Sequence, residues 1–169
     1  MRTHTIQRSV RTHKNWYAAC VGDSTAVWAA LLRVHASVVP LLDHELQTTH
    51  NLPLTWYDVL LELSAAPEGR LTMGELGHLA VVSRSRVSRV VDELVRAGLV
   101  TKQPNPDDRR SAFAVITDDG RARRREAAPT YVAGIERHVT SRLSAREAEV
   151  IAEGLRKVIA ASEVHQLRG

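Results

Sequence analysis

The chain has 169 residues, of which 44% are hydrophobic and 25% charged, so it is globular rather than disordered and long enough to bury a core. Its formal net charge of +4 at pH 7 does not establish a nucleic-acid partner, and its single cysteine, Cys20, excludes a disulfide framework within the chain and suits the reducing cytoplasm. No apolar run approaches the ~20 residues that a membrane span needs, so we expect no membrane partner.

The N-terminal part of the chain predicts a basic arm followed by helices. Residues 1–22 have basic residues without an apolar stretch behind them, so we expect a flexible arm or short extra helix and not a secretory signal. From residue 23 to about residue 50, apolar side chains recur every three or four positions, which predicts a long helix that Pro40 kinks. Thr55 is predicted to cap the next helix, with Asp58 three residues later, and that helix ends before Pro67.

Two short helices with a tight connection are predicted between Thr72 and Gly98. Thr72 and Glu75 form a capping box that opens the first helix, and Ser83 is predicted to cap the second. In the second helix, valines and leucines occupy one face, and arginines and serines occupy the other. Gly98 is predicted to end this helix in a left-handed conformation. The pattern is typical of a helix-turn-helix, whose second helix lies in the major groove of DNA.

A basic hairpin is predicted after the second helix. Residues 99–103 and 112–117 have the pattern of two strands, and the turn between them is rich in Pro, Asn and Asp. Basic residues outnumber acidic ones by seven to four between residues 84 and 110, so positive charge is concentrated there. We therefore predict a mainly α fold with a small β-hairpin wing (α+β), a winged helix-turn-helix that binds DNA as a regulator. No pattern typical of an enzyme is found.

Two further helices are predicted after the hairpin. The first starts at Thr117 and carries a run of four arginines between Arg121 and Arg125, which we interpret as a solvated helix surface, with DNA phosphate contacts as the alternative. The second is capped at Ser144 by a sequence that ends in Glu147.

The terminal helices carry apolar stripes wider than one chain easily covers. We predict that a two-fold dimer covers these stripes and sets two recognition helices ~34–36 Å apart, with packing inside one chain as the alternative. Residues 23–52 and 121–169 are thus predicted to form a helical dimerisation region, and residues 53–120 the DNA-binding domain. The apolar residues that suggest the dimer are Trp28, Leu32, Val39, Ile151 and Ile159.

From about Ala26 to the C-terminus, the chain resembles the MarR family of bacterial transcription regulators. The family pattern in the wing is an Asp, one spacer, an Arg, a short strand ending in Leu-Thr, and a glycine. It falls on Asp108, Arg110, Ile116, Thr117 and Gly120. Ile116 replaces the usual leucine, and Lys102 stands where arginine is common, which keeps the charge but loses the two-pronged geometry. The resemblance implies a homodimer on a palindromic operator, usually a repressor relieved by a small ligand or by oxidation.

The resemblance also implies which residues contact DNA. Arg110 is expected to enter the minor groove while Asp108 orients it, since a narrow groove attracts arginine. Phosphate contacts are expected from Thr72, Ser83, Ser88, Lys102 and Arg109. Base contacts are expected from Ser85, Arg86 and Arg89, with Arg84 on the same helix.

In the family, small ligands bind between the dimerisation helices and the winged module. Residues of the first long helix and of the segment around residue 56 would line this crevice. The candidates are Trp28, Arg33, His35, Trp56 and Tyr57. Arg33 or His35 would pair with an anionic aromatic or carboxylate ligand. The alternative for each residue is an ordinary place in the core or in an interface.

Redox and metal chemistry are less well supported. One branch of the family senses peroxide through an N-terminal cysteine, but the nearest charge to Cys20 is Asp23, which would raise the pKa of the thiol. We therefore favour a structural or exposed thiol at Cys20 over a redox switch, and a redox-responsive regulator that uses Cys20 is kept as an alternative function. The spacing of the histidines does not predict a zinc site, and no cofactor is expected. The other alternative is a DNA-organising protein that binds without sequence preference.

Overall fold

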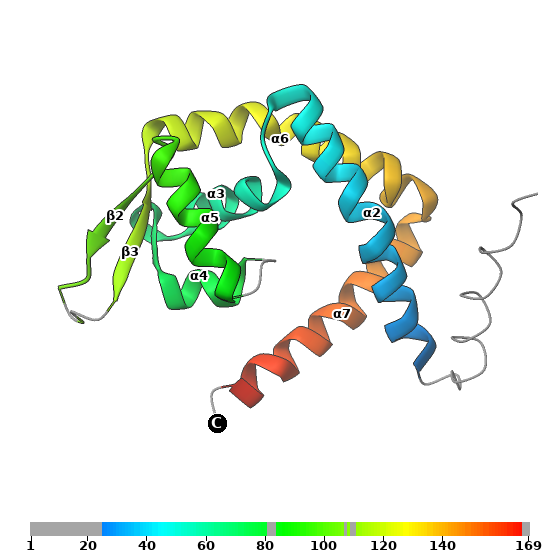
Figure 1. The fold of residues 1–169 in the computed structure, drawn as a ribbon. Helices are drawn as coiled ribbons and strands as arrows, with labels where there is room; N and C mark the ends of the chain where they lie inside the picture. The colour runs from blue at the N-terminus through cyan, green and yellow to red at the C-terminus, as the bar shows by residue number, and fades with distance from the viewer. Residues whose placement is uncertain (1–24, 81–83, 107, 109–110, 167–169) are drawn as a thin grey trace, which may run out of the picture. The chain divides into compact units, whose positions relative to one another are not determined.

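The computed structural model describes residues 25–80, 84–106, 108 and 111–166 (Figure 1). The helices are α2 (Ala26–His50), α3 (Leu54–Ala65), α4 (Met73–Leu79), α5 (Arg84–Arg96), α6 (Asp118–His138) and α7 (Ala145–Gln166), with 3-10 turns η2 (Pro67–Gly69) and η3 (Thr140–Arg142). The strands are β1 (Arg70–Thr72), β2 (Val100–Pro104) and β3 (Ala112–Ile116). The chain divides within α2 into two compact units, one up to Pro40 and the other from Leu41. The N-terminal arm with Cys20 lies outside the described residues.

The strands form one antiparallel sheet in the order β1-β3-β2. Lys102 of β2 pairs with Ala114 of β3, and on the other side Thr72 of β1 pairs with Phe113. The mainly α fold with a hairpin wing is thus confirmed, and the sheet has one strand more than the sequence predicted. β1 is only three residues long, too short for an alternating pattern to identify it.

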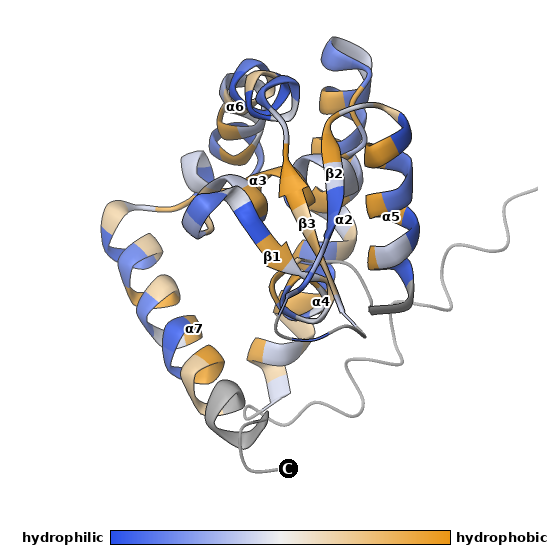
Figure 2. Cartoon of the chain, turned by 90° about the vertical axis from the view of Figure 1, so that its left-hand side faces the viewer, coloured by the Kyte–Doolittle hydropathy of each residue, from blue (hydrophilic) through white to orange (hydrophobic). Residues whose placement is uncertain are grey.

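The core of the unit from Leu41 lies between α3, α4, α5 and the sheet. Each fully buried leucine contributes about 1.5–3 kcal/mol through the hydrophobic effect. In Figure 2, the apolar residues of α5 face the strands. The side chains that are at most 1% exposed include Leu46, Leu60, Leu63, Leu76, Val87, Val91, Leu94 and Val100.

Most helix ends described by the structure have the caps that the sequence predicted. Thr72 Oγ1 accepts a hydrogen bond from the Glu75 amide (3.2 Å), and Glu75 Oε2 accepts one from the Thr72 amide (2.7 Å), so the capping box of α4 is confirmed. Ser144 and Glu147 make the same exchange before α7. Gly98, two residues after the end of α5, is left-handed with φ of 74°, as predicted for the glycine that ends this helix.

The predicted start of α3 is wrong. The helix begins at Leu54 after Pro53, and Thr55 lies inside its first turn. The Leu54 amide donates to Asp43 Oδ1 of α2 at 2.8 Å, so a side chain from the preceding helix replaces the local cap. Asp58, expected near the cap, is on the second turn instead.

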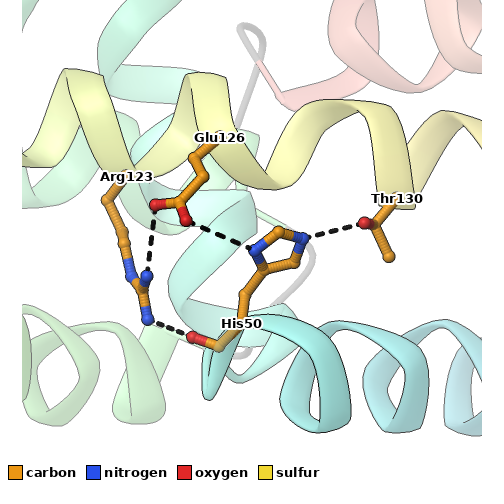
Figure 3. A network of polar contacts seen from close by, with 4 residues as sticks. All are labelled: His50, Arg123, Glu126 and Thr130. Atoms are coloured by element: carbon orange, nitrogen blue, oxygen red, sulfur yellow. Dashed lines mark hydrogen bonds and ion pairs between the residues drawn. The ribbon is translucent and has the colours of Figure 1, made fainter.

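The last turns of α2 are tied to α6 by polar contacts (Figure 3). The His50 ring lies 2.8 Å from Thr130 Oγ1 and 4.0 Å from a Glu126 carboxylate oxygen. Arg123 donates to the His50 carbonyl oxygen and pairs with Glu126 at 3.3 Å. Because these side chains come from both helices, they fix the end of α2 against α6.

One turn earlier in α2, Glu45 makes a second connection to α6. Its carboxylate lies 2.6 Å from Arg137 and 2.8 Å from the His138 ring. The hydrogen bond from His138 and the contacts with Arg137 lower the pKa of Glu45, against a smaller effect of burial. Gly134 permits this approach, since a Cβ there would come within 2.7 Å of Leu42.

By length and composition, α2 could cross a membrane, contrary to the expectation from the sequence. Its second half argues against that placement, because Leu46 is fully buried in the protein core and Asp43 and Glu45 bind residues of α3 and α6. Residues 26–40 alone are fewer than the ~20 that a bilayer requires. The helix continues through Pro40 as one element.

Candidate DNA-binding surface

The surface of α5 divides into a buried and an exposed face. Val87, Val91 and Leu94 are at most 1% exposed, whereas Arg86, Ser88 and Arg89 are exposed. This is the amphipathic division that the sequence predicted, and it leaves hydrogen-bond donors and positive charge directed outward. Arg84 and Ser85 form the first turn of the helix, and Ser83 lies outside the described residues.

The two acidic residues of α5 are each bound to a neighbouring element. Asp92 Oδ1 lies 2.6 Å from Lys102 Nζ of β2. Glu93 Oε2 accepts a hydrogen bond of 3.0 Å from the indole N–H of Trp56 in α3. Neither contact is predictable from residue patterns, because the partners lie far apart in the chain.

The N-terminal end of α4 and the wing lie on either side of α5 in the sequence and provide the other expected DNA contacts. Thr72 is occupied in the capping box, so its hydroxyl is held at the start of α4. In the wing, Asn105 Nδ2 donates to Ser111 Oγ at 2.9 Å, and the Ser111 amide donates to the Asp108 carbonyl oxygen at 3.0 Å. These bonds close the turn between β2 and β3. The neighbouring Arg109 and Arg110, expected to contact DNA, lie outside the described residues.

The comparisons with known proteins agree with this geometry. A family model described as "MarR family" matches residues 50–111. The crystal structure of Sco3205, a MarR family transcriptional regulator from Streptomyces coelicolor in complex with DNA, is 30% identical, with a TM-score of 0.74, over 83% of this chain and 89% of that one. The chain belongs to the MarR family.

Two further relatives support the same assignment. AbsC, a MarR family transcriptional regulator from Streptomyces coelicolor, is 27% identical with a TM-score of 0.73, over 85% of this chain and 97% of that one. The transcriptional repressor YetL of Bacillus subtilis is 22% identical over 76% of each chain. This MarR-family protein is therefore a transcription regulator, and since its relatives are regulators, the expectation that it is not an enzyme is confirmed.

The ligand-site candidates of this MarR-family regulator are divided between the two units. Trp28, Arg33 and His35 belong to the unit up to Pro40, whereas Trp56 and Tyr57 belong to the unit from Leu41. The structure therefore does not define one site that contains all of them.

Within α3, the two aromatic candidates have structural partners. The Tyr57 ring is only 2% exposed and lies 4.6 Å from the Tyr131 ring of α6, centroid to centroid. Trp56 uses its indole N–H to bind Glu93. Tyr57 therefore has almost no exposed surface that a ligand could contact in this conformation.

Asp58 of α3, which the residue pattern placed near a helix cap, is instead a partly buried carboxyl, and the pattern did not predict that burial. Burial of its carboxyl, together with repulsion from Glu62, raises its pKa from 3.8 to about 6. Burial also raises the pKa of Tyr131, with Asp58 and Tyr57 adding to the effect. The signal in the sequence is an acid inside a mostly apolar helix, although its spacing from Thr55 favours a capping role.

The arginine run of α6 is only partly the solvated surface that was expected. Arg125 is exposed, but Arg123 binds the His50 carbonyl oxygen, and Arg121 lies against Gly69. The Nε atom of Arg124 is buried and makes no hydrogen bond to the described residues. Three of the four side chains therefore pack against the protein rather than extend into solvent.

Proposed function

We propose that this MarR-family regulator is a cytoplasmic homodimeric repressor that binds a palindromic operator and is released by a small anionic or aromatic ligand. The observation that carries the DNA-binding part is the outward face of α5 with Arg86, Ser88 and Arg89 beside the hairpin of β2 and β3. A helix of this kind fits the major groove, where arginine donates two hydrogen bonds to guanine. The wing would reach the adjacent minor groove through Arg110.

The dimer is supported by apolar side chains that the chain leaves exposed. On α7, Val150, Ile151, Val158 and Ile159 are 46–62% exposed, although they lie on a helix with a regular apolar stripe. On α2, Val27 and Trp28 are 66% and 63% exposed. Several large apolar side chains exposed along one helix usually mark an interface, and a stable interface buries ~1,200–2,000 Å² in total. A second copy of the chain would also match the two-fold symmetry of a palindromic operator.

The proposal of a ligand rests on the residues that α2 and α3 offer. In the unit up to Pro40, Trp28, Arg33 and His35 offer aromatic surface and basic groups, which suit an anionic aromatic compound. In the unit from Leu41, Trp56 and Tyr57 offer aromatic surface. Asp58 beside Tyr57 adds a group that changes charge near pH 6. The ligand would act by separating elements that hold α5 in its DNA-binding position.

The test is binding of the purified protein to the promoter DNA beside its own gene, compared with a scrambled duplex at fixed salt. A repressor of this type binds the promoter selectively, as a dimer, with a two-fold symmetric footprint. Specific affinity exceeds non-specific affinity by typically ~10³–10⁷ for such proteins. Equal, weak binding to both duplexes would reject the operator hypothesis and support a DNA-organising protein. Compounds that release the promoter complex would identify the ligand class.

Arg86 provides the matched mutational test of base contact. Arg86→Ala should reduce discrimination between promoter and scrambled DNA by ~1–3 kcal/mol if its guanidinium contacts a base. Arg125→Ala removes the same exposed charge from α6 and should leave discrimination unchanged. An equal loss of affinity for both duplexes in Arg86→Ala would make Arg86 a phosphate contact.

A further inference from the structure

The two acidic residues of α5 hold the recognition helix from two sides. Adjacent residues of an α-helix point about 100° apart, so the side chains of Asp92 and Glu93 leave the helix in different directions. Asp92 binds Lys102 in the sheet, and Glu93 binds Trp56 in α3. Both contacts lie in the second half of α5, while Arg86 and Arg89 are in the first half. The half that would contact DNA is thus oriented by side chains one to two turns away.

Lys102 has a particular place in the wing. It is in the middle of β2, and β2 ends at Pro104, immediately before the turn closed by Asn105 and Ser111. A bond from Lys102 to α5 therefore fixes the strand that leads into the wing. The Lys102 and Asp92 side chains are 39% and 54% exposed, so the pair is at the surface that also carries the exposed face of α5.

The charge balance of this pair argues against a phosphate contact by Lys102. A lysine that binds phosphate contributes an uncompensated positive charge and displaces counterions from DNA. Here the Asp92 carboxylate is 2.6 Å from Nζ, so the pair is neutral as a unit. If Asp92 had no positioning role, its negative charge near DNA would only weaken binding.

We propose that Lys102 is a positioning residue: its ion pair with Asp92 sets the angle between the recognition helix α5 and the wing. This inference rests on the proposed DNA-binding function and replaces the phosphate contact expected for Lys102. It makes an unusual prediction about Asp92, because removal of a negative charge from a DNA-binding surface should weaken specific binding.

The experiment uses the full-length protein and a duplex that the wild type selects from a random-sequence pool, with a scrambled duplex as reference. Asp92→Asn should bind the selected duplex roughly three- to tenfold more weakly, the range set by one exposed ion pair in each of two subunits. Its binding to the scrambled duplex should not weaken. Glu149→Gln, which removes the acid of an exposed ion pair with Arg146 on α7, is the matched control.

The salt dependence of Lys102→Gln separates positioning from phosphate contact. A positioning residue leaves the slope of log K against log salt unchanged, whereas each lost phosphate contact lowers it by roughly 0.9. The exchanged variant, Asp92→Lys with Lys102→Asp, should recover most of the specific affinity, because the pair is rebuilt in reverse. Thermal unfolding of each variant identifies any loss that comes from misfolding.

Three results would overturn this inference: tighter binding of both duplexes by Asp92→Asn, a reduced salt slope in Lys102→Gln, or no recovery in the exchanged variant. Failure of the proposed function is distinct, because the wild type itself would then select no duplex. In that case the inference falls with it.

Discussion

Helix α5 of the DNA-binding module and helix α7 have similar apolar patterns, but the apolar side chains are buried in α5 and exposed in α7. In α5, Val87, Val91 and Leu94 are at most 1% exposed, whereas in α7, Ile151 and Ile159 are 46% and 57% exposed. Both helices have apolar residues at helical spacing. The difference shows that periodicity identifies which face of a helix is to be covered but does not identify what covers it. Within the module, other elements of the same chain cover the apolar face of α5. We infer that a second copy of the chain covers the apolar face of α7.

A substitution in the module core should have the largest effect. Leu63→Ala removes a fully buried side chain between α3 and its neighbours, so the free energy of unfolding should fall by about 2–5 kcal/mol. Urea unfolding should show a lower midpoint with an unchanged slope. The matched control is Leu79→Ala in α4, whose side chain is 52% exposed and whose replacement should change stability by less than ~0.5 kcal/mol. Equal losses in both variants would contradict the described core.

A substitution on α7 should instead change association. Ile151→Ser removes apolar surface that we assign to the dimer interface, and because the dimer contains it twice, the dissociation constant should rise ~10- to 100-fold. Sedimentation velocity over a concentration series measures this. Glu149→Ser places the same residue at an exposed, charged position two residues earlier and should leave association unchanged. A dimer of unaltered strength in Ile151→Ser would mean that α7 is covered in another way.

The features that could be predicted from sequence are those whose partners lie within a few residues. The capping box of Thr72 and Glu75 and the left-handed Gly98 depend on local backbone geometry, so residue type and spacing specify them. The amphipathic face of α5 is local in the same sense. Its arginines can therefore be assigned to a candidate DNA-binding surface from the amino-acid sequence alone.

The features that could not be predicted join distant parts of the chain. β1 exists because it pairs with β3, which lies beyond α4 and α5. The start of α3 differs from the prediction because Asp43, eleven residues earlier, accepts the hydrogen bond from Leu54. The Asp92–Lys102 pair likewise depends on how β2 returns along α5. Polar side chains have many alternative partners in a sequence, and only the packing of the elements selects one.

The contact between α3 and α6 connects the DNA-binding module with the C-terminal helices. Because Asp58 of α3 is partly buried, the free energy of unfolding should depend on pH. The folded protein raises the pKa of Asp58 to about 6, so the folded state holds this proton more tightly than the unfolded state does. The contribution of protonated Asp58 to the free energy of unfolding is therefore fully present below about pH 4, and it is lost as pH rises through 6. Asp58→Asn, which stays neutral, should gain about 1–2 kcal/mol relative to wild type at pH 7, after allowance for solvent near a half-buried carboxyl.

Urea unfolding between pH 4 and pH 7 tests this. The two proteins should differ least at pH 4, and the difference should grow up to about pH 6 and then level off. Glu136→Gln, an exposed acid on α6, is the control and should show no such growth. Parallel curves for Asp58→Asn and wild type would contradict the assigned burial of Asp58.

The smallest expected effect lies at Thr117, where the sheet of the module passes into α6. Its Oγ1 accepts a hydrogen bond from the Gly120 amide at 3.0 Å and donates one to the Gly98 carbonyl oxygen at 2.9 Å. Thr117→Ala should lower the free energy of unfolding by about 1 kcal/mol, as for other N-caps, while Thr117→Ser should retain most of it. Because Gly98 lies two residues after the end of the recognition helix, Thr117→Ala should also weaken DNA binding more than its stability loss alone explains. A variant with the stability loss but normal DNA binding would show that the cap supports α6 without orienting α5.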